Sequence, residues 1–383
     1  MAAVQRSEKQ ANAKPQTRAS NIELLRILTM IGVIVLHYNN AGIGGCFALV
    51  EKNSLNFYIM HVLESISIVA VDLFVLISGF FMCRSTKRDI FKPISLIFQV
   101  IVFKELIYIL SVLLAGNRIS VKAVLLDLIP NNYFVILYAA VYLISPFINL
   151  LLETLDGRNR KRLVAMLVIV FALEPTAVDM LNEIRGETFH GLSTVGAYGS
   201  QWGYSIVNFI LMYIIGAYLR YNEDRIKSFP KWKAGLGFMA FAAVDTVWSL
   251  VNEHFTIYDA RSAYEYCNPL VIGGTVLIFI LFHNMQIRSS RIINLLAKAS
   301  FTVYLTHAAM LKYFRIPGHV NRNVAVYVLH VLATAAAIYL VSWVMFICYD
   351  LVTKPLFAFI RSKIHFYEYD VKTEDKKDKR NKK

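Results

Sequence analysis

The stretch NIELLRILTMIGVIVLHYNN, residues 21–40, is an apolar run with an arginine near its start and a histidine near its end. Ten residues separate Arg26 from His37. Eleven helical residues advance by about 1,100°, or three turns plus about 20°, so both side chains are expected on one face, about 16 Å apart along the axis. Ionisable groups inside a membrane are costly and usually functional, and a histidine there can carry protons near neutral pH. We therefore predict a functional site along this helix.

The composition of the whole chain is that of a membrane protein. Of its 383 residues, 57% are hydrophobic and 17% are charged, and the mean hydropathy is +0.50. A membrane-spanning helix needs about 20 mostly apolar residues and must satisfy its own backbone hydrogen bonds. We predict an all-α, polytopic membrane helical bundle of about ten transmembrane helices in one domain. The predicted spans are 21–39, 56–82, 90–115, 132–152, 163–181, 204–220, 232–251, 268–284, 299–314 and 325–349.

The basic residues predict how the bundle is oriented. With the N-terminus in the cytoplasm, the inner loops hold more Lys and Arg than the outer loops, as the positive-inside rule requires. An even number of spans then places both termini in the cytoplasm. We predict a basic cytoplasmic tail (1–20), a membrane domain (21–366) and a lysine-rich disordered cytoplasmic tail (367–383). The net charge of +14 is assigned to loops and tails that face membrane lipid, and no nucleic-acid partner is expected.

The chain shows no motif for a metal or a nucleotide. Its four cysteines lack metal-binding or redox spacing, and no Walker loop or dinucleotide fingerprint occurs. Cys46 and Cys267 are both predicted on the outer side, which leaves a disulfide between them open. We expect no metal cofactor.

Polar residues inside three other spans are predicted to share the depth of His37. Helical rise from the inner ends places residues near Ser65 in the second span, Glu105 in the third and His307 in the ninth at overlapping heights. In the second span, His61, Glu64, Ser65 and Asp72 form one polar stripe. This arrangement indicates a reaction chamber. Each of these residues can also have a purely structural role. Asp72 and Glu105 can pair with Lys104 or with another helix, and His61 and Glu64 can be structural or rim groups. Any lone histidine can form a hydrogen bond between helices.

Several motifs, taken in order, resemble the acyltransferase 3 family of bacterial integral-membrane acyltransferases. They are the Arg-x₁₀-His pair, VDLFVLISGFF (71–81) followed by a basic cluster, NNYFVILYAAVYLISPFINLLL (131–152) and ASFTVYLTHAAML (299–311). The resemblance covers roughly residues 20–350. It departs at Asn132-Tyr133-Phe134, where relatives often carry a Trp-Phe pair, and in a basic cluster looser than the usual paired arginine.

The resemblance implies transfer of an acyl group, usually acetyl from acetyl-CoA as co-substrate, to a hydroxyl of an exported or lipid-linked glycan at the bacterial cell membrane. Arg26 and the inner basic residues suit the phosphates of the donor, although positive-inside topology also explains those residues. His37 is expected to act as general base or as acyl carrier. The cofactor-binding candidates are Arg26, Arg84, Lys87, Arg88 and Lys92. The other catalytic candidates are Asp72 and His307, and the oxyanion or substrate candidates are Ser78, Glu105, Tyr304 and Thr306.

Two other function classes remain open from the sequence. A transporter or flippase of a lipid-linked saccharide would also use buried charges, but it predicts internal pseudo-repeats, and none is visible. A glycan polymerase or ligase would predict a large outer loop, whereas the outer loops here reach only about 22 residues, as in 182–203. For an acyltransferase, the outer loops 116–130, 182–203 and 252–268 are expected to line the acceptor entrance.

Overall fold

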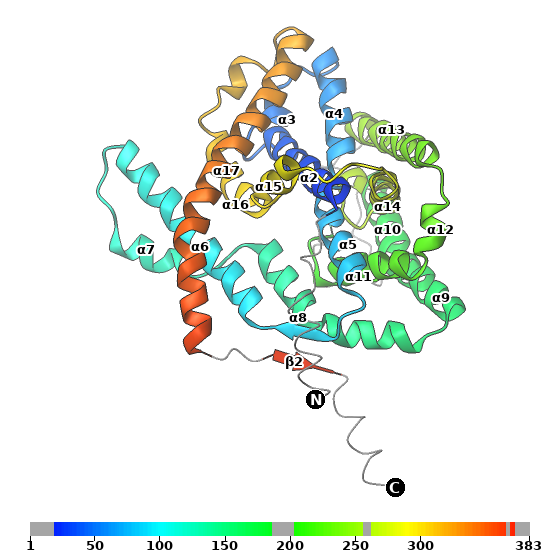
Figure 1. The fold of residues 1–383 in the computed structure, drawn as a ribbon. Helices are drawn as coiled ribbons and strands as arrows, with labels where there is room; N and C mark the ends of the chain where they lie inside the picture. Colours follow the sequence, from blue (N-terminus) through cyan, green and yellow to red (C-terminus); the bar gives the residue numbers. More distant parts are fainter. Residues whose placement is uncertain (1–18, 186–202, 256–261, 365–367, 372–383) are drawn as a thin grey trace.

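The computed structural model describes residues 19–185, 203–255, 262–364 and 368–371, and these form a bundle of helices with one small sheet (Figure 1). The predicted tails 1–20 and 367–383 lie mostly outside the described residues. The helices are α2 (Ser20–Asn39), α3 (Cys46–Leu49), α4 (Leu55–Ser67), α5 (Ala70–Met82), α6 (Phe91–Leu114), α7 (Val121–Asp127), α8 (Tyr133–Thr154), α9 (Gly157–Val168), α10 (Glu174–Arg185), α11 (Ile206–Tyr221), α12 (Glu223–Lys227), α13 (Lys231–Phe255), α14 (Pro269–His283), α15 (Arg291–Ala297), α16 (Ser300–Leu311) and α17 (Val324–Lys363). A π-helical turn, Ile169–Leu173, joins α9 to α10, and short 3₁₀ turns cover Ser262–Tyr264 and Ile316–Gly318.

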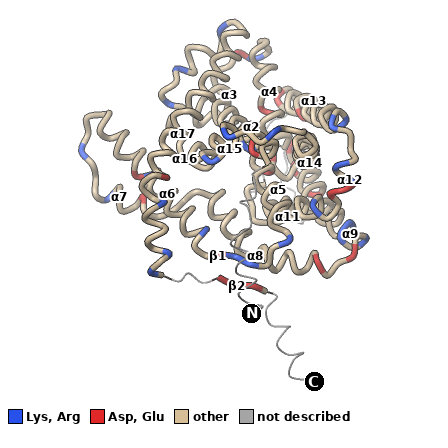
Figure 2. The backbone as a smooth tube through the Cα atoms, viewed as in Figure 1, with Lys and Arg blue, Asp and Glu red and all other residues tan. Residues whose placement is uncertain are grey.

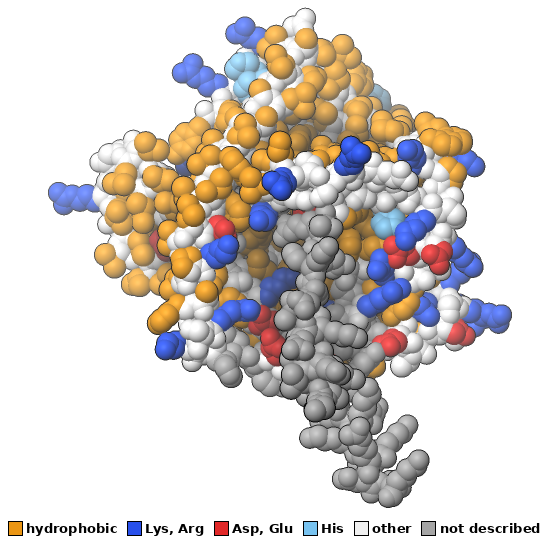
Figure 3. Space-filling view, viewed as in Figure 1, with side chains coloured by type: hydrophobic (Ala, Val, Ile, Leu, Met, Phe, Trp, Pro, Cys, Tyr) orange, Lys and Arg blue, Asp and Glu red, His pale blue; other side chains and the backbone are white. Residues whose placement is uncertain are grey.

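The predicted fold class, an all-α polytopic helical bundle, is confirmed. All ten predicted segments are helical, but eight helical stretches of the described chain are long and apolar enough to cross a membrane. The other two are α11, with 16 residues, and α16, with 12. Charged residues gather near helix ends and in loops, notably around α9 and α12, while the middle parts of the helices carry few (Figure 2). Hydrophobic side chains cover much of the face over α6, α7 and α17, as expected of a lipid-facing surface (Figure 3).

The second predicted span is two helices, not one. Ser54 caps the start of α4 by accepting a hydrogen bond from the Phe57 backbone N–H at 3.1 Å. The helix ends at Ser67, and α5 begins at Ala70. The two halves pack on different neighbours, α4 mainly on α13 and α2, and α5 mainly on α11. This break separates the parts of the chain that line two different cavities, described below.

The crossing of α5 and α11 fixes the inner half of this segment and depends on two glycines. A Cβ atom on Gly79 would lie 2.1 Å from the Tyr213 carbonyl oxygen, and one on Gly216 would lie 2.1 Å from the Leu76 carbonyl oxygen. No side chain fits at those distances, so the two backbones approach as closely as glycine allows. The crossing holds α5 in a defined position beside α2.

A short strand lies at the start of the predicted C-terminal tail. Residues Glu368–Asp370 form strand β2, which pairs antiparallel with β1 (Lys87–Asp89) in the turn between α5 and α6. Thr86 Oγ1 donates a hydrogen bond to Asp370 Oδ1 at 2.7 Å, and Arg361 forms an ion pair with Asp89. The sequence did not reveal this strand, because three residues are too few to show the alternation of polar and apolar side chains that is typical of a strand. Its pairing partner is also distant in the sequence.

The cysteines are all free thiols, so the disulfide left open between Cys46 and Cys267 does not form. Cys46 is buried in the outer loop, with its sulfur 3.5 Å from the Tyr327 hydroxyl. Burial raises the pKa of the Cys46 thiol to about 11, which keeps it protonated and poorly reactive.

Candidate active site

One face of α2 lines two cavities, one after the other along the helix. Arg26, Met30 and Val33 line the first, of about 300 Å³, and His37 and Asn40 line the second, of about 600 Å³. Their spacings of three and four residues are those of a single helical face, so the predicted phase of Arg26 and His37 holds. We call the cavity at Arg26 the inner cavity and the one at His37 the outer cavity, following the predicted orientation.

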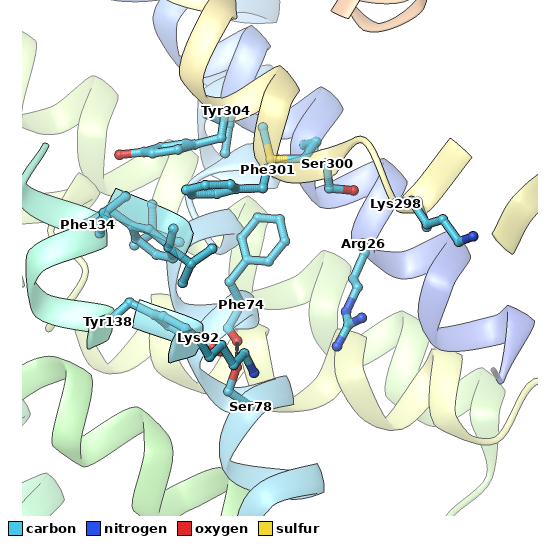
Figure 4. A pocket seen from close by; sticks show the side chains of 16 residues that line it. Arg26, Phe74, Ser78, Lys92, Phe134, Tyr138, Lys298, Ser300, Phe301 and Tyr304 are labelled. Carbon is cyan, nitrogen blue, oxygen red and sulfur yellow. Dashed lines mark hydrogen bonds between the residues drawn. The ribbon is translucent and has the colours of Figure 1, made fainter. Parts of the chain in front are cut away.

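The inner cavity combines basic and aromatic side chains. Its charged lining residues within the described chain are Arg26, Lys92 and Lys298, with no Asp or Glu among them. Figure 4 shows Lys92, Ser78 and Tyr138 together at one end, Tyr304 and Phe301 at the opposite end, and Arg26 at the side. Such a cavity suits an anionic ligand with a long uncharged arm.

Arg26 is anchored but keeps most of its hydrogen-bonding capacity. Its Nη1 lies 3.1 Å from Glu23 Oε1, one turn earlier in α2. The side chain is 31% exposed, whereas that of Glu23 is 7% exposed. A guanidinium has five N–H donors in a fixed fork, so the remaining donors are available to a ligand in the cavity.

Ser78 lies in the inner cavity with Arg26 and Lys92, away from the cavity that His37 lines. Its Oγ donates to the Phe74 carbonyl oxygen at 2.9 Å and lies 3.3 Å from the Tyr138 hydroxyl. This placement brings Ser78 to the same end of the cavity as Lys92 and away from His37.

The structure brings His37 and His307 together. Their ring centroids are 4.6 Å apart, with the planes at 77°. His37 Nδ1 lies 2.9 Å from the Val33 carbonyl oxygen, and His307 Nδ1 lies 3.1 Å from the Val303 carbonyl oxygen. A carbonyl can only accept, so each neutral imidazole carries its proton on Nδ1 and presents an unprotonated Nε2. Within the described chain, Nε2 of His307 has no hydrogen-bond partner.

Tyr304 connects this histidine pair to the inner cavity. Its ring lines that cavity and lies 6.0 Å from the ring of His307. Its hydroxyl donates to Asn132 Oδ1 at 3.0 Å, and Asn132 also caps α8 by accepting from the Val135 N–H. The position where the sequence departs from the family pattern therefore joins α8 to α16. From one cavity to the other, the order is Tyr304, His307, His37.

The inner basic cluster separates into different roles. Arg84 and Lys87 are exposed and line neither cavity, whereas Lys92 lines the inner one. Arg88 is buried, and its guanidinium donates to protein acceptors only: the carbonyl oxygens of Met82, Ser85, Lys87 and Tyr142 and the Ser145 hydroxyl. Arg88 therefore fastens the turn after α5 to α8, which leaves Lys92 as the member of this cluster that reaches the inner cavity.

Three other candidates line neither cavity among the described residues. Asp72 is buried and accepts a hydrogen bond from Asn208 Nδ2 at 3.0 Å. Thr306 is bonded within the bundle, with Oγ1 donating to the Thr302 carbonyl oxygen at 2.9 Å and lying 2.6 Å from Ser342 Oγ. Glu105 is apart from both cavities, and its neighbour Lys104 pairs with Asp127 at 2.9 Å.

Sequence reasoning missed most of the outer cavity. Its walls hold His61, Glu64, Ser249 and Tyr264, which come from α4, α13 and the turn before α14. His61 and Glu64 were assigned structural or rim roles, although their polar stripe was a valid signal. Of the predicted entrance loops, 182–203 and 252–268 are described only in part, since residues 186–202 and 256–261 lie outside the described chain, and 116–130 adds no lining residue.

Comparison with known proteins identifies the family. The family model for an acyltransferase domain matches residues 20–347, which include both cavities and the histidine pair. Searches of the curated proteins and of the solved structures find no match. The matched segment covers most of the chain and begins at the first residue of α2. The chain therefore belongs to the acyltransferase 3 family and is a multi-pass membrane acyltransferase.

Proposed function

We propose that the protein transfers an acetyl group from acetyl-CoA at the inner cavity to a hydroxyl of an exported or lipid-linked glycan at the outer cavity. The observation that carries this proposal is α2, whose single face lines both cavities, with Arg26 at one and His37 at the other. With a cytoplasmic donor and an external acceptor, the proposed location is the plasma membrane of a bacterium.

The inner cavity complements the donor in charge and in shape. Coenzyme A carries several phosphate charges, and Arg26, Lys92 and Lys298 are the charged side chains of this cavity. A volume of about 300 Å³ lined by aromatic rings suits the pantetheine arm and the thioester, with the nucleotide part left at the inner surface. The acetyl group would then point toward Tyr304 and the histidine pair.

The first mechanism makes His37 a general base. Nε2 takes the proton of the acceptor hydroxyl while the hydroxyl oxygen attacks the thioester carbonyl carbon. The tetrahedral intermediate collapses by breaking the carbon–sulfur bond, and the imidazolium returns the proton to the thiolate of coenzyme A. The Nδ1–H bond to the Val33 carbonyl oxygen holds the ring in the tautomer that this step requires.

The second mechanism makes His37 an acyl carrier. Nε2 attacks the thioester carbonyl carbon, the thiolate of coenzyme A leaves, and an acetyl-imidazolium forms, because Nδ1 keeps its proton. The acceptor hydroxyl then attacks this carbonyl, the carbon–nitrogen bond breaks, and His307 is close enough to take the hydroxyl proton through its own unprotonated Nε2. Both mechanisms use the same residues, and they differ in whether the acetyl group is ever bound to the protein.

A flippase is not supported by this arrangement. Moving a lipid-linked sugar requires a path wide enough for the sugar, whereas no described residue lines both cavities. Family membership also favours group transfer over transport.

Membrane vesicles of known sidedness test the proposal. Sealed inside-out vesicles given external acetyl-CoA with a radiolabelled acetyl group should label glycan inside the vesicle and release free coenzyme A outside. Sealed right-side-out vesicles should do neither until they are permeabilised. If sealed right-side-out vesicles use external acetyl-CoA equally well, both substrates bind on one face and the through-membrane arrangement is wrong. If no coenzyme A is released from either kind of vesicle, acetyl-CoA is not the donor.

A further inference from the structure

The wall of the outer cavity that α4 forms carries a buried histidine with a free nitrogen. His61 is 1% exposed, and its Nδ1 lies 2.7 Å from the Ser249 hydroxyl and 3.0 Å from the Tyr264 hydroxyl. Its Nε2 has no hydrogen-bond partner among the described residues, although the residue lines a cavity of about 600 Å³. Buried polar atoms in native proteins are almost always paired, so this nitrogen needs a partner from outside the described residues, and a ligand in the cavity can supply it.

Glu64 adds a second polar group to the same wall. It follows His61 by three residues on α4, so both side chains share one helical face and both line the outer cavity. Asn39 Nδ2 donates to Glu64 Oε2 at 2.8 Å, which fixes the position of the carboxyl group. His61 and Glu64 thus form a pair of fixed hydrogen-bonding groups on the cavity that also holds His37.

The charge of the outer cavity excludes one class of ligand. Its acidic lining residues are Glu64 and Glu253, and no Lys or Arg of the described chain lines it. The cation beside the rim, Lys52, is paired with Glu253 at 3.5 Å. An anionic sugar would bring its carboxylate or phosphate toward these carboxyl groups without a cation to compensate, which costs binding energy.

Aromatic rings complete a surface suited to a sugar ring. Tyr264 lies against His61, with ring centroids 6.2 Å apart and nearly parallel planes, and Phe47 packs edge-on against His61 at 5.4 Å. Tyr204 and Tyr266 also line the cavity, with ring centroids 4.9 Å apart. Tyrosine offers an apolar face together with a hydroxyl, so it can contact both the C–H face and the hydroxyls of a sugar.

We propose that the outer cavity is the subsite for an uncharged sugar residue of the acceptor glycan, held by hydrogen bonds to His61 Nε2 and the Glu64 carboxyl group. This proposal rests on the proposed function, because it assumes that the outer cavity receives the acceptor. It deepens that function by naming the class of residue acetylated: a hexose, deoxyhexose or N-acetylhexosamine, and not a uronic acid, sialic acid or phosphorylated sugar.

The acetylated residue can be identified directly. Inside-out vesicles are labelled from radiolabelled acetyl-CoA, the glycan is cut into single residues under conditions that keep the O-acetyl ester, and mass spectrometry identifies the labelled sugar. We expect the label on an uncharged residue. Label on a sugar with a carboxylate or phosphate overturns this proposal while leaving the proposed function intact, whereas absence of both label and coenzyme A release counts against the proposed function itself.

Two variants test whether His61 and Glu64 hold the acceptor. His61→Gln and the more conservative Glu64→Gln should each raise the KM for vesicle glycan about tenfold, the effect of about one lost hydrogen bond. The KM for acetyl-CoA and the slow hydrolysis of acetyl-CoA without acceptor should stay unchanged, which shows that the variants fold. His254→Gln and Glu51→Gln, at residues that do not line the cavity, are the controls. If both cavity variants keep the wild-type KM for glycan, the subsite is wrong.

Discussion

The inner and outer cavities lie on the same face of α2, yet their linings have opposite character. The inner cavity has Arg26, Lys92 and Lys298 as its charged residues, and the outer has Glu64 and Glu253. Since positive-inside topology accounts for basic residues near the inner surface but not for carboxyl groups in the outer cavity, the outer lining is the more informative of the two. Under the proposed function, each cavity would select its own substrate by charge.

The boundary between the cavities is as informative as their linings. No described residue lines both, and Tyr304, His307 and His37 stand between them. A thioester that can be reached from both sides would be exposed to water as well as to the acceptor. Under the proposed function, a barrier that contains His37 would keep hydrolysis slow while leaving only a short path for the acetyl group.

The largest expected effect comes from removing the group at this boundary. His37→Ala should lower acetyl transfer by about 10²–10⁴-fold, the usual cost of losing positioned proton transfer. Its melting temperature should stay near that of the wild type, because His37 makes its one described hydrogen bond to a backbone carbonyl oxygen. Transfer assays on purified protein measure the rate. His307→Ala provides the comparison: a loss larger than that of His37→Ala would exchange the roles of the two histidines, and wild-type transfer by His37→Ala would remove it from the mechanism.

The second effect sharpens the assignment of the inner cavity to the donor. Arg26→Lys keeps the charge but loses the planar fork that binds phosphate through two hydrogen bonds, so acetyl-CoA should bind about tenfold more weakly. Calorimetry measures this affinity, with Arg158→Lys, an exposed substitution in the first turn of α9, as the control. Unchanged affinity in Arg26→Lys would assign the residue to the lipid interface, where a long basic side chain can also be stable.

The sequence predicted the helices and the phase of α2 because both depend on local periodicity. It could not predict the break between α4 and α5, since Ser67, Ile68 and Val69 carry no helix-breaking signal and the break follows from packing on different neighbours. The predicted span 204–220 nearly matches α11, Ile206–Tyr221, whereas the predicted span 299–314 extends past the end of α16 at Leu311.

Only the part of the candidate site that lies on a single helix could be predicted from the sequence. Arg26 and His37 are visible as a spacing, whereas the contact of His61 with Ser249 joins residues 188 positions apart and depends on tertiary structure. Composition also cannot distinguish a basic residue that binds a ligand from one bonded to the protein. Arg88 appeared equivalent to Lys92 in the sequence, yet its donors are used by carbonyl oxygens and a hydroxyl of neighbouring segments.

The difference between Lys92 and Arg88 leads to the smallest expected effect on donor binding. It also tests most directly which residues of the inner basic cluster bind a ligand. Lys92 is exposed at the inner cavity, with its Nζ 4.8 Å from the centre of the Tyr142 ring. Because an exposed ammonium contributes about 1 kcal/mol to phosphate binding, Lys92→Gln should weaken acetyl-CoA binding about fivefold and leave the melting temperature unchanged.

Arg88→Lys should behave in the opposite way. Lysine cannot reproduce the fork that satisfies several acceptors at once, and buried carbonyl oxygens left without donors cost about 1–3 kcal/mol each. The melting temperature of the detergent-solubilised protein should therefore fall by at least about 3 °C, while the fraction that remains folded binds acetyl-CoA with nearly wild-type affinity. Calorimetry and thermal melts on both variants separate the two roles. If Arg88→Lys instead loses donor affinity at an unchanged melting temperature, the wild-type Arg88 guanidinium contacts the donor and not these carbonyl oxygens. The inner cavity then has one more phosphate-binding residue than its lining shows.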